Sequence, residues 1–163
     1  MAAAVVTFLF VGDVMLGRGV SSILRREPAR YVWGDVLPVF AGADCRFANL
    51  ECVLSDRGEP WSDPLKVFHF RSDAKNVEAL TEAGVDFVSL ANNHILDYGY
   101  DALRDTLAAL DRAGIARAGA GTDLAEAMRP AVRAVRGGSI GLIAFTDNEP
   151  VWAAEASQPG VFH

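Results

Sequence analysis

The sequence predicts an α/β fold with a mixed sheet, and three observations lead to this prediction. In the first two thirds of the 163 residues, apolar β-rich runs alternate with segments of helical periodicity. Two β-rich runs around a Gly-Gly turn then predict an antiparallel hairpin. Hydrophobic residues make up 51% of the chain and charged residues 22%, which suits a packed core and excludes a disordered or low-complexity protein.

The elements of the first half follow from local patterns of apolar, turn-forming and helix-breaking residues. In chain order, we expect a strand over residues 5–11 that is buried on both faces, a short helix around Val20, Ile23 and Leu24 that Pro28 ends, a strand over 46–50, a surface loop over 55–64 and a short strand over 66–70.

The second half carries clearer helix signals. In chain order, we expect a helix from Ser72 and Asp73 to Ala83 with Gly84 ending it, a buried strand over 85–91, an amphipathic helix over 101–113 that Gly114 stops, a short helix with Asp123 and Glu126 as its capping box, and a hairpin of strands 131–135 and 140–145. Residues 148–163 show no clear periodicity.

Length and charge limit the possible functions. The chain fits a single domain, or part of a larger one, and residues 1–163 are expected to form one incomplete domain. Its net charge of −6 argues against a nucleic-acid-binding surface. No apolar run approaches the roughly 20 residues of a membrane span. No basic residue precedes Arg18, so no signal peptide is predicted and a cytoplasmic location is the default expectation, with an export segment further upstream left open.

The two cysteines, Cys45 and Cys52, do not have the spacing of a zinc-ligand pair. We expect two small buried thiols, and a single bridge between them is the alternative.

Polar side chains follow three predicted strands at the points where the strands end. Asp13 follows the first, Asn49 and Glu51 follow the second, and Asn92-Asn93-His94 follows the third. Ligands of open α/β sheets bind at the carboxyl ends of the strands. Carboxylate, amide and imidazole groups together suit Mn, Fe, Zn or Mg, whereas the alternative is that each group simply forms a turn.

Four further residues or motifs have two readings. Asp97 lies three residues after His94 and is placed to orient its ring, which favours a working histidine over a structural one. Arg18 either binds an anionic group or neutralises its neighbours. Residues 119–122 form either a weak phosphate-binding turn or an ordinary loop. His69 is expected at the surface or at a sheet edge.

These residues also carry a resemblance to a known family. The sequence resembles the poly-gamma-glutamate capsule biosynthesis (CapA-like) proteins of the calcineurin-like metallophosphatase superfamily at Gly12-Asp13-x-Met15-Leu16-Gly17-Arg18, at Asn49-Leu50-Glu51 and at Ala91-Asn92-Asn93-His94-x-Leu96-Asp97-Tyr98-Gly99. The resemblance implies a four-layer α/β/β/α sandwich around a dinuclear metal site.

The resemblance also implies roles for individual residues. Asp13, Glu51, Asn49 and Asn93 would be metal ligands, His94 with Asp97 would donate a proton, and Arg18 and Asn92 would contact an anionic substrate. Two departures matter. Met15 stands where the superfamily has a histidine, and no histidine occurs between Ile95 and Phe162. The chain thus resembles the N-terminal part of a longer member, to be completed by a C-terminal segment or another capsule-assembly protein.

Three functions remain open at this point. The chain is a metal-dependent hydrolase acting on a phosphoester, a non-catalytic protein that binds an anionic polymer during capsule assembly, or an inactive fragment of a longer enzyme.

Overall fold

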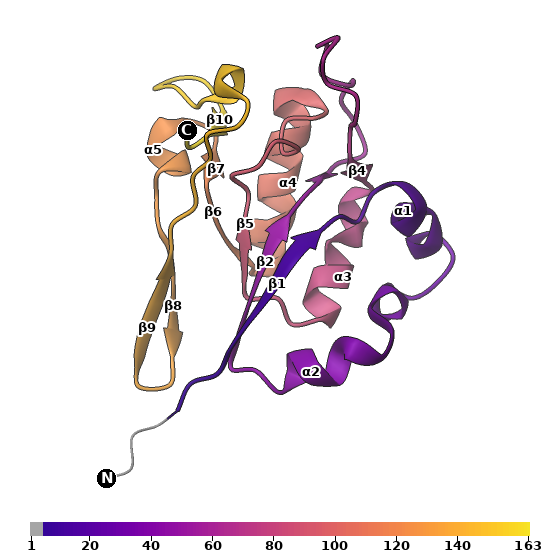
Figure 1. Cartoon of the computed structure of the whole chain (residues 1–163), viewed down its shortest axis with the longest axis vertical. Helices are drawn as coiled ribbons and strands as arrows, with labels where there is room; N and C mark the ends of the chain where they lie inside the picture. The colour runs from indigo at the N-terminus through magenta and orange to yellow at the C-terminus, as the bar shows by residue number, and fades with distance from the viewer. Residues whose placement is uncertain (1–4) are drawn as a thin grey trace.

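The centre of the fold is a four-stranded parallel sheet, seen in a computed structural model that describes residues 5–163 (Figure 1). Its strands, in the spatial order β1-β2-β5-β6, are β1 (Phe8–Val14), β2 (Cys45–Leu50), β5 (Phe87–Ser89) and β6 (Ala116–Ala118). The predicted α/β class is confirmed. Antiparallel pairing also occurs, but in separate two-stranded sheets rather than within this one.

Five α-helices and three 3₁₀ helices are described beside this sheet. The α-helices are α1 (Arg18–Leu24), α2 (Leu37–Ala41), α3 (Val77–Glu82), α4 (Gly99–Ala113) and α5 (Leu124–Ala127), and the 3₁₀ helices are η1 (Ala29–Val36), η2 (Ala74–Asn76) and η3 (Pro150–Trp152). Leu80 of α3 and Leu103 of α4 belong to the main hydrophobic core, together with Leu50 of β2. Helix α4 ends at Gly114, whose φ of +69° is the left-handed conformation that the sequence predicts there.

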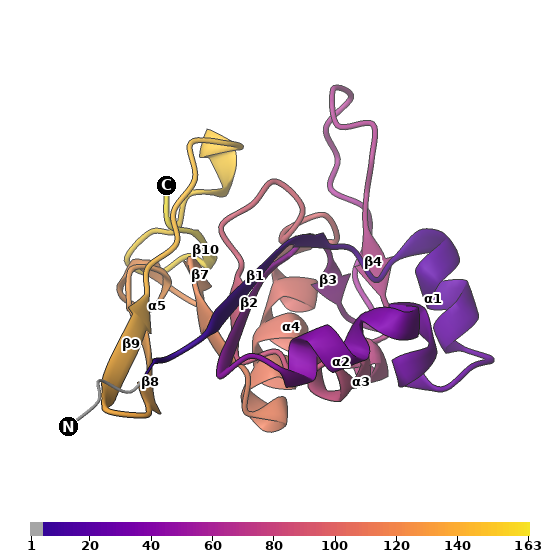
Figure 2. The same cartoon turned by 60° about the horizontal axis from the view of Figure 1, so that its bottom comes forward.

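A hairpin lies on the other side of the sheet from α3 (Figures 1 and 2). Its strands are β8 (Ala131–Val135) and β9 (Gly138–Leu142), and β9 ends three residues before the predicted strand does. Ile140 and Leu142 pack on Phe47 of β2 and Phe87 of β5, which form a second, smaller core. The short pairs are β3 (Val53–Leu54) with β4 (Arg71–Ser72) and β7 (Ala120–Gly121) with β10 (Gly160–Val161).

Strand β1 differs from its prediction in position and in burial. It begins at Phe8 and runs through Asp13 to Val14, and its pairing with β2 is irregular between Phe10 and Asp13. The side chains of Phe8 and Phe10 are 40% and 71% exposed, so the expectation of burial on both faces is wrong. The physical reason is that β1 is an edge strand, while the hairpin packs on Phe47 and Phe87 of the inner strands.

The short strand predicted over residues 66–70 does not form. Within this segment, Phe70 N donates to Asp97 Oδ2 in the turn after β5 at 2.6 Å, and Lys66 N donates to Asp63 O at 3.1 Å. Phe70 O accepts from Val53 N at 3.2 Å. Since a strand needs these groups for a neighbouring strand, only Arg71 and Ser72 pair, with β3.

The two thiols and the C-terminal segment complete the fold. Cys45 and Cys52 are free and buried, so the predicted burial is confirmed and the alternative bridge is wrong. Residues 148–163 pack onto the domain in spite of their lack of periodicity, with Trp152 fully buried. Within residues 5–163, every helix is too short or too polar to span a bilayer.

Candidate metal centre

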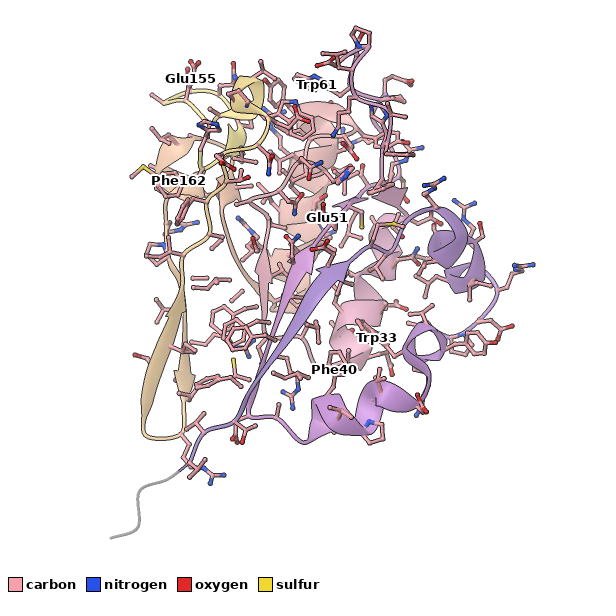
Figure 3. The ribbon with its side chains drawn as sticks, viewed as in Figure 1. Trp33, Phe40, Glu51, Trp61, Glu155 and Phe162 are labelled. Atoms are coloured by element: carbon pink, nitrogen blue, oxygen red, sulfur yellow. The ribbon has the colours of Figure 1, made fainter. Side chains whose placement is uncertain are left out.

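The strand register brings the first two predicted site residues together. Asp13 of β1 is paired with Asn49 of β2, so their side chains leave neighbouring strands at the same level. Glu51 follows the last residue of β2, and Figure 3 shows it at the carboxyl ends of β1 and β2. The irregular pairing before Asp13 is the kind of local distortion that re-aims a side chain at a sheet edge.

One side-chain amide group donates hydrogen bonds to both carboxylates. Asn49 Nδ2 donates to Asp13 Oδ1 at 2.9 Å and to Glu51 Oε2 at 2.5 Å. Burial raises the pKa of Glu51, and the nearby Asp13 carboxylate raises it further, against the lowering effects of His94 and Asn49. Two negative groups are thus kept close at a partly desolvated position, which is an arrangement that a cation would stabilise.

Asn92 braces the turn that carries His94. Its Oδ1 accepts from His94 N at 3.0 Å, and its Nδ2 donates to Asn49 Oδ1 and to Leu50 O, both at 2.9 Å. The side chain is buried and its hydrogen-bonding groups are engaged within the protein. The predicted contact of Asn92 with substrate stays a prediction, and the observed bonds join the turn after β5 to the end of β2.

His94 faces Glu51 with one nitrogen and a buried aspartate with the other. Its Nδ1 lies 2.6 Å from Asp97 Oδ2, and its Nε2 lies 3.8 Å from Glu51 Oε1 and 3.3 Å from Asn93 Nδ2. The ring also stacks on Phe70, with 4.1 Å between ring centroids. Asp97 thus lies where it can fix the tautomer and orientation of the ring, with Nε2 directed at the site.

The donors fit a divalent metal in their chemistry but not in their number. The oxygen atoms of Asp13 and Glu51, the amide groups of Asn49 and Asn93 and the imidazole of His94 suit hard or borderline cations. However, within residues 5–163 no three His, Cys, Asp or Glu side chains are grouped closely enough to hold an ion. The donors that the described chain brings together are therefore fewer than a divalent ion needs.

Arg18 lies beside this cluster, in a separate polar cavity. Its guanidinium sits 6.0 Å from the centroid of Phe70, the ring that stacks on His94. A cavity of about 520 Å³ opens next to Arg18 and is also lined by Arg25 and Arg71. Arg25 is neutralised by Asp73, whereas Arg18 forms no ion pair among residues 5–163. Its φ of +53° is a conformation that non-glycine residues rarely adopt.

The remaining two sequence features, residues 119–122 and His69, make contacts within the fold. Gly119 has a φ of +94°, and a Cβ there would lie 2.6 Å from Ala91 Cβ, so close packing accounts for this glycine. Ala120 and Gly121 pair with β10. His69 is half-buried, with Nε2 3.0 Å from Trp61 O.

Sequence reasoning missed three residues next to this cluster: Lys66, Glu149 and Trp152. Lys66 Nζ lies 3.0 Å from Asp97 Oδ1 and 3.5 Å from Glu149 Oε1, and it lies over the Trp152 ring. Lys66, Asn93, His94 and Glu149 also line a cavity of about 270 Å³. For Lys66 the available signal was its position between apolar Leu65 and Val67 in a chain with a single other lysine, Lys75, and for Glu149 it was a family resemblance over residues 145–150.

Comparisons with known proteins agree with these motifs. The family model described as bacterial capsule synthesis protein PGA_cap matches residues 7–162. A probable polyglutamine synthesis accessory protein of Mycobacterium tuberculosis strain H37Rv is 37% identical over 196 aligned residues, which cover 97% of this chain and 51% of that protein.

Two relatives from Bacillus are similar over nearly the whole chain. The capsule biosynthesis protein CapA of Bacillus anthracis is 33% identical over 94% of this chain and 38% of its own length. The PGA biosynthesis protein CapA of Bacillus subtilis strain 168 is 29% identical over 93% of this chain and 40% of its own length. The chain thus spans about half or less of the length of these relatives. Its fold, its motifs and the matching family model together place the chain in the bacterial capsule synthesis protein family PGA_cap.

Proposed function

We propose that the cluster at the carboxyl ends of β1, β2 and β5 is a metal-dependent, phosphoesterase-like hydrolytic site that serves the synthesis of a poly-glutamate capsule polymer. The printed names of the relatives support the biological role. The single observation that carries the chemistry is the His94–Asp97 pair, 2.6 Å apart, with the free ring nitrogen facing Glu51 and Asn93.

This geometry supports the following residue roles. Asp13 and Glu51, with the amide groups of Asn49 and Asn93, would hold a divalent ion such as Mn, Fe, Zn or Mg. When bound, such an ion supplies Lewis-acid polarisation of a phosphoryl oxygen and lowers the pKa of bound water. His94 holds a proton at Nε2 and gives it to the leaving oxygen, while Asp97 accepts from Nδ1 and keeps the ring in place.

The shortage of ligands is part of the proposal. Because the described chain supplies two carboxylates and one histidine, further donors are expected from the sequence that the relatives have beyond the matched half, as a continuation of the chain or a separate segment. We therefore expect only weak hydrolysis by the chain alone, and metal binding is the primary test.

The first experiment measures metal per folded chain by elemental analysis, after loading with Mn or Zn and removal of the excess. We expect about one ion per chain. Asp13→Asn should weaken binding by about tenfold or more. Asp35→Asn, at an exposed position far from the cluster in sequence, is the matched control and should bind like the wild type. A folded wild type without metal, or equal binding by Asp13→Asn, would contradict the site.

Turnover tests the proton donor separately. We expect metal-dependent hydrolysis of a generic phosphodiester, and His94→Gln should lower its rate about 100-fold or more, which is the usual contribution of a general acid. His69→Gln is the matched control, because His69 bonds to a backbone carbonyl and not to a carboxylate. Equal rates for both variants would remove His94 from the mechanism.

The Arg18 cavity favours a second candidate function, which is binding of an anionic polymer without catalysis. Arg18, which has no ion pair among residues 5–163, lies beside a 520 Å³ cavity that is also lined by Arg71, by the paired Arg25 and Asp73, and by Asp56. The two arginines outside that pair suit carboxylate groups. In that case polyglutamate binding is salt-sensitive, survives Asp13→Ala and is lost in Arg18→Ala. Arg136→Ala, in the exposed hairpin turn, serves as the control.

A further inference from the structure

Lys66 has surroundings that are unusual for a lysine. Its side chain is 6% exposed, although it comes from an irregular segment. Its Nζ donates to Asn93 O at 2.5 Å, lies 3.0 Å from Asp97 Oδ1 and 3.5 Å from Glu149 Oε1, and sits 4.7 Å from the centroid of Trp152. A lysine is almost never buried unless it is paired, and here its partners come from the turn after β5 and from the C-terminal segment.

We propose that Lys66 is a positioning residue that fixes the carboxylate of Asp97 and, through it, the tautomer and direction of the His94 ring. The importance of this role rests on the proposed function, in which His94 transfers a proton. The contact itself is independent of whether a metal binds or a substrate is turned over.

The two oxygen atoms of Asp97 are used differently, and this difference carries the argument. Oδ2 lies 2.6 Å from His94 Nδ1 and accepts from Phe70 N at 2.6 Å. Oδ1 has no hydrogen-bond donor with good geometry among residues 5–163, and the ammonium group of Lys66 at 3.0 Å is its counter-charge. Lys66 is thus the cation that balances the far side of a fully buried carboxylate.

Loss of Lys66 therefore affects more than one ion pair. A buried carboxylate without a counter-charge is strongly disfavoured, and it rotates toward other donors. This rotation changes the acceptor that faces His94 Nδ1. The ring then loses the bond that selects its tautomer, and Nε2 is no longer held toward Glu51.

Aromatic side chains exclude water from this contact. Trp61 packs edge-on against Trp152, with 5.5 Å between ring centroids. Lys66 Nζ lies over the Trp152 ring, and Trp61 is five residues before Lys66 in the sequence. Figure 3 shows Trp61 at the edge of the molecule where residues 61–70 approach the C-terminal segment. Because charge interactions strengthen as water is excluded, the covered position makes the Lys66–Asp97 contact stronger than a surface ion pair.

The contribution of Lys66 to stability can be separated from its effect on Asp97 and His94. Glu149 is its second acidic partner and does not contact His94 or Asp97 in the hydrogen bonds and ion pairs of the described residues. Glu149→Gln therefore weakens the attachment of the C-terminal segment and leaves the Lys66–Asp97 contact in place. It is the matched control for lost stability.

The experiment is ¹⁵N–¹H NMR of the histidine rings in the metal-free protein, with His94→Gln identifying the His94 signals. We expect an Nδ1–H that is hydrogen-bonded to Asp97 in the wild type. Lys66→Met should lose this pattern, and Lys66→Arg should restore it at least in part, because it keeps the cation. Glu149→Gln and Lys75→Met should keep the pattern. A folded Lys66→Met protein with unchanged His94 signals would overturn the proposal.

A second measurement covers the case in which Lys66→Met does not fold. The chain has two lysines, the buried Lys66 and the exposed Lys75, so reductive methylation of the wild type compares them directly. We expect Lys66 to react about tenfold or more slowly than Lys75, because the segment must open first. Equal rates would overturn the proposal. Both readouts need neither metal nor substrate, so failure of the hydrolase proposal leaves them interpretable.

Discussion

Two glutamates of this protein have pKa values shifted in opposite directions, and their neighbours explain the difference. Glu51 is partly desolvated beside Asp13, so its pKa is raised. Burial alone would also raise the pKa of Glu126, but hydrogen bonds from Thr122 and Arg117 outweigh burial and lower it to about 2. The first environment disfavours a charge in the absence of a cation, and the second supplies the donors and the cation itself.

Glu126→Gln should therefore destabilise the protein in a pH-dependent way. The folded pKa of about 2 lies below the unfolded value near 4.5, so the charged form stabilises the fold above the unfolded pKa, and this contribution is lost as pH falls toward the folded pKa. After allowance for solvent screening, we expect a loss of roughly 1–2 kcal/mol near pH 7 and almost none near pH 2. Urea unfolding at several pH values measures it.

The control for this prediction is Glu27→Gln, since Glu27 is exposed and forms no ion pair among residues 5–163. Its effect should be small at every pH. A loss of stability in Glu126→Gln that stays constant down to pH 2 would show that packing, and not charge, is responsible.

At the residue scale, the sequence revealed local relationships and missed distant ones. His94 and Asp97 are three residues apart, so a short turn brings them together and their pairing was predictable. Lys66 and Glu149 are far apart in the chain, and only the folded path of residues 61–70 and of the C-terminal segment makes them neighbours. No periodicity marks such a contact, because neither residue lies in a regular helix or strand.

At the scale of elements, strong local signals gave good predictions and weak ones were overridden by tertiary contacts. Helix α4 has both a periodic apolar face and a C-terminal glycine, and its predicted end matches. Residues 66–70 have β-rich composition, but Phe70 N donates to the Asp97 side chain and not to a neighbouring strand. Strand β1 is apolar in sequence and still exposes Phe10, because burial depends on which neighbours cover a strand and composition does not report this.

Gly119 offers a test at this scale. A Cβ at Gly119 would lie 2.6 Å from Ala91 Cβ and 2.9 Å from Ala91 N, and its φ of +94° is unfavourable for alanine. We expect Gly119→Ala to cost about 3 kcal/mol, from strain and overpacking together. Thermal or urea unfolding measures this loss.

Two hairpin glycines separate the causes of that loss. Gly137 has a φ of +82° with open space around it, so Gly137→Ala should cost about 1 kcal/mol from backbone strain alone. Gly138 lacks a positive φ and also faces open space, so Gly138→Ala should be close to neutral. Equal effects of Gly119→Ala and Gly137→Ala would mean that the contact with Ala91 yields easily.

At the scale of the whole molecule, the two faces of the parallel sheet differ in how well they are covered. Helices α3 and α4 contribute to a large core, whereas the opposite face has only the small core of Cys45, Phe47 and Phe87 under the hairpin. Phe10 stacks on Phe47, and Phe47 stacks on Phe87, with centroid distances of 4.7 and 4.9 Å. This row of rings runs from an exposed edge into the interior.

Along this row of rings, the loss of stability on mutation to alanine should increase from the exposed edge toward the interior. Phe87→Ala removes a fully buried ring and should cost about 3–5 kcal/mol, whereas Phe10→Ala should cost about 1 kcal/mol or less. Phe10→Ala should also lower the binding of a hydrophobic dye to the native protein. Comparable losses of stability in the two variants would indicate that the exposed part of the sheet face is covered in solution.

The layered architecture was predictable in class but not in its detailed topology. Alternation of strands and helices correctly indicated an α/β protein. The separation of the antiparallel pairs from the main sheet was not predictable, because strand pairing depends on long-range contacts that composition does not encode. Membership of the family, in contrast, followed from three short motifs at strand ends.

The burial of Lys66 beneath Glu149 and Trp152 has a consequence for the order in which the protein is made. On the ribosome, the residues that bring Asp13, Asn49 and His94 together emerge well before residues 149–152. While it lacks residues 149–152, a nascent chain leaves the Lys66 ammonium group without part of its cover. The covering of Lys66 by Glu149 and Trp152 is thus completed late in synthesis, after the residues that carry the chemistry have been made.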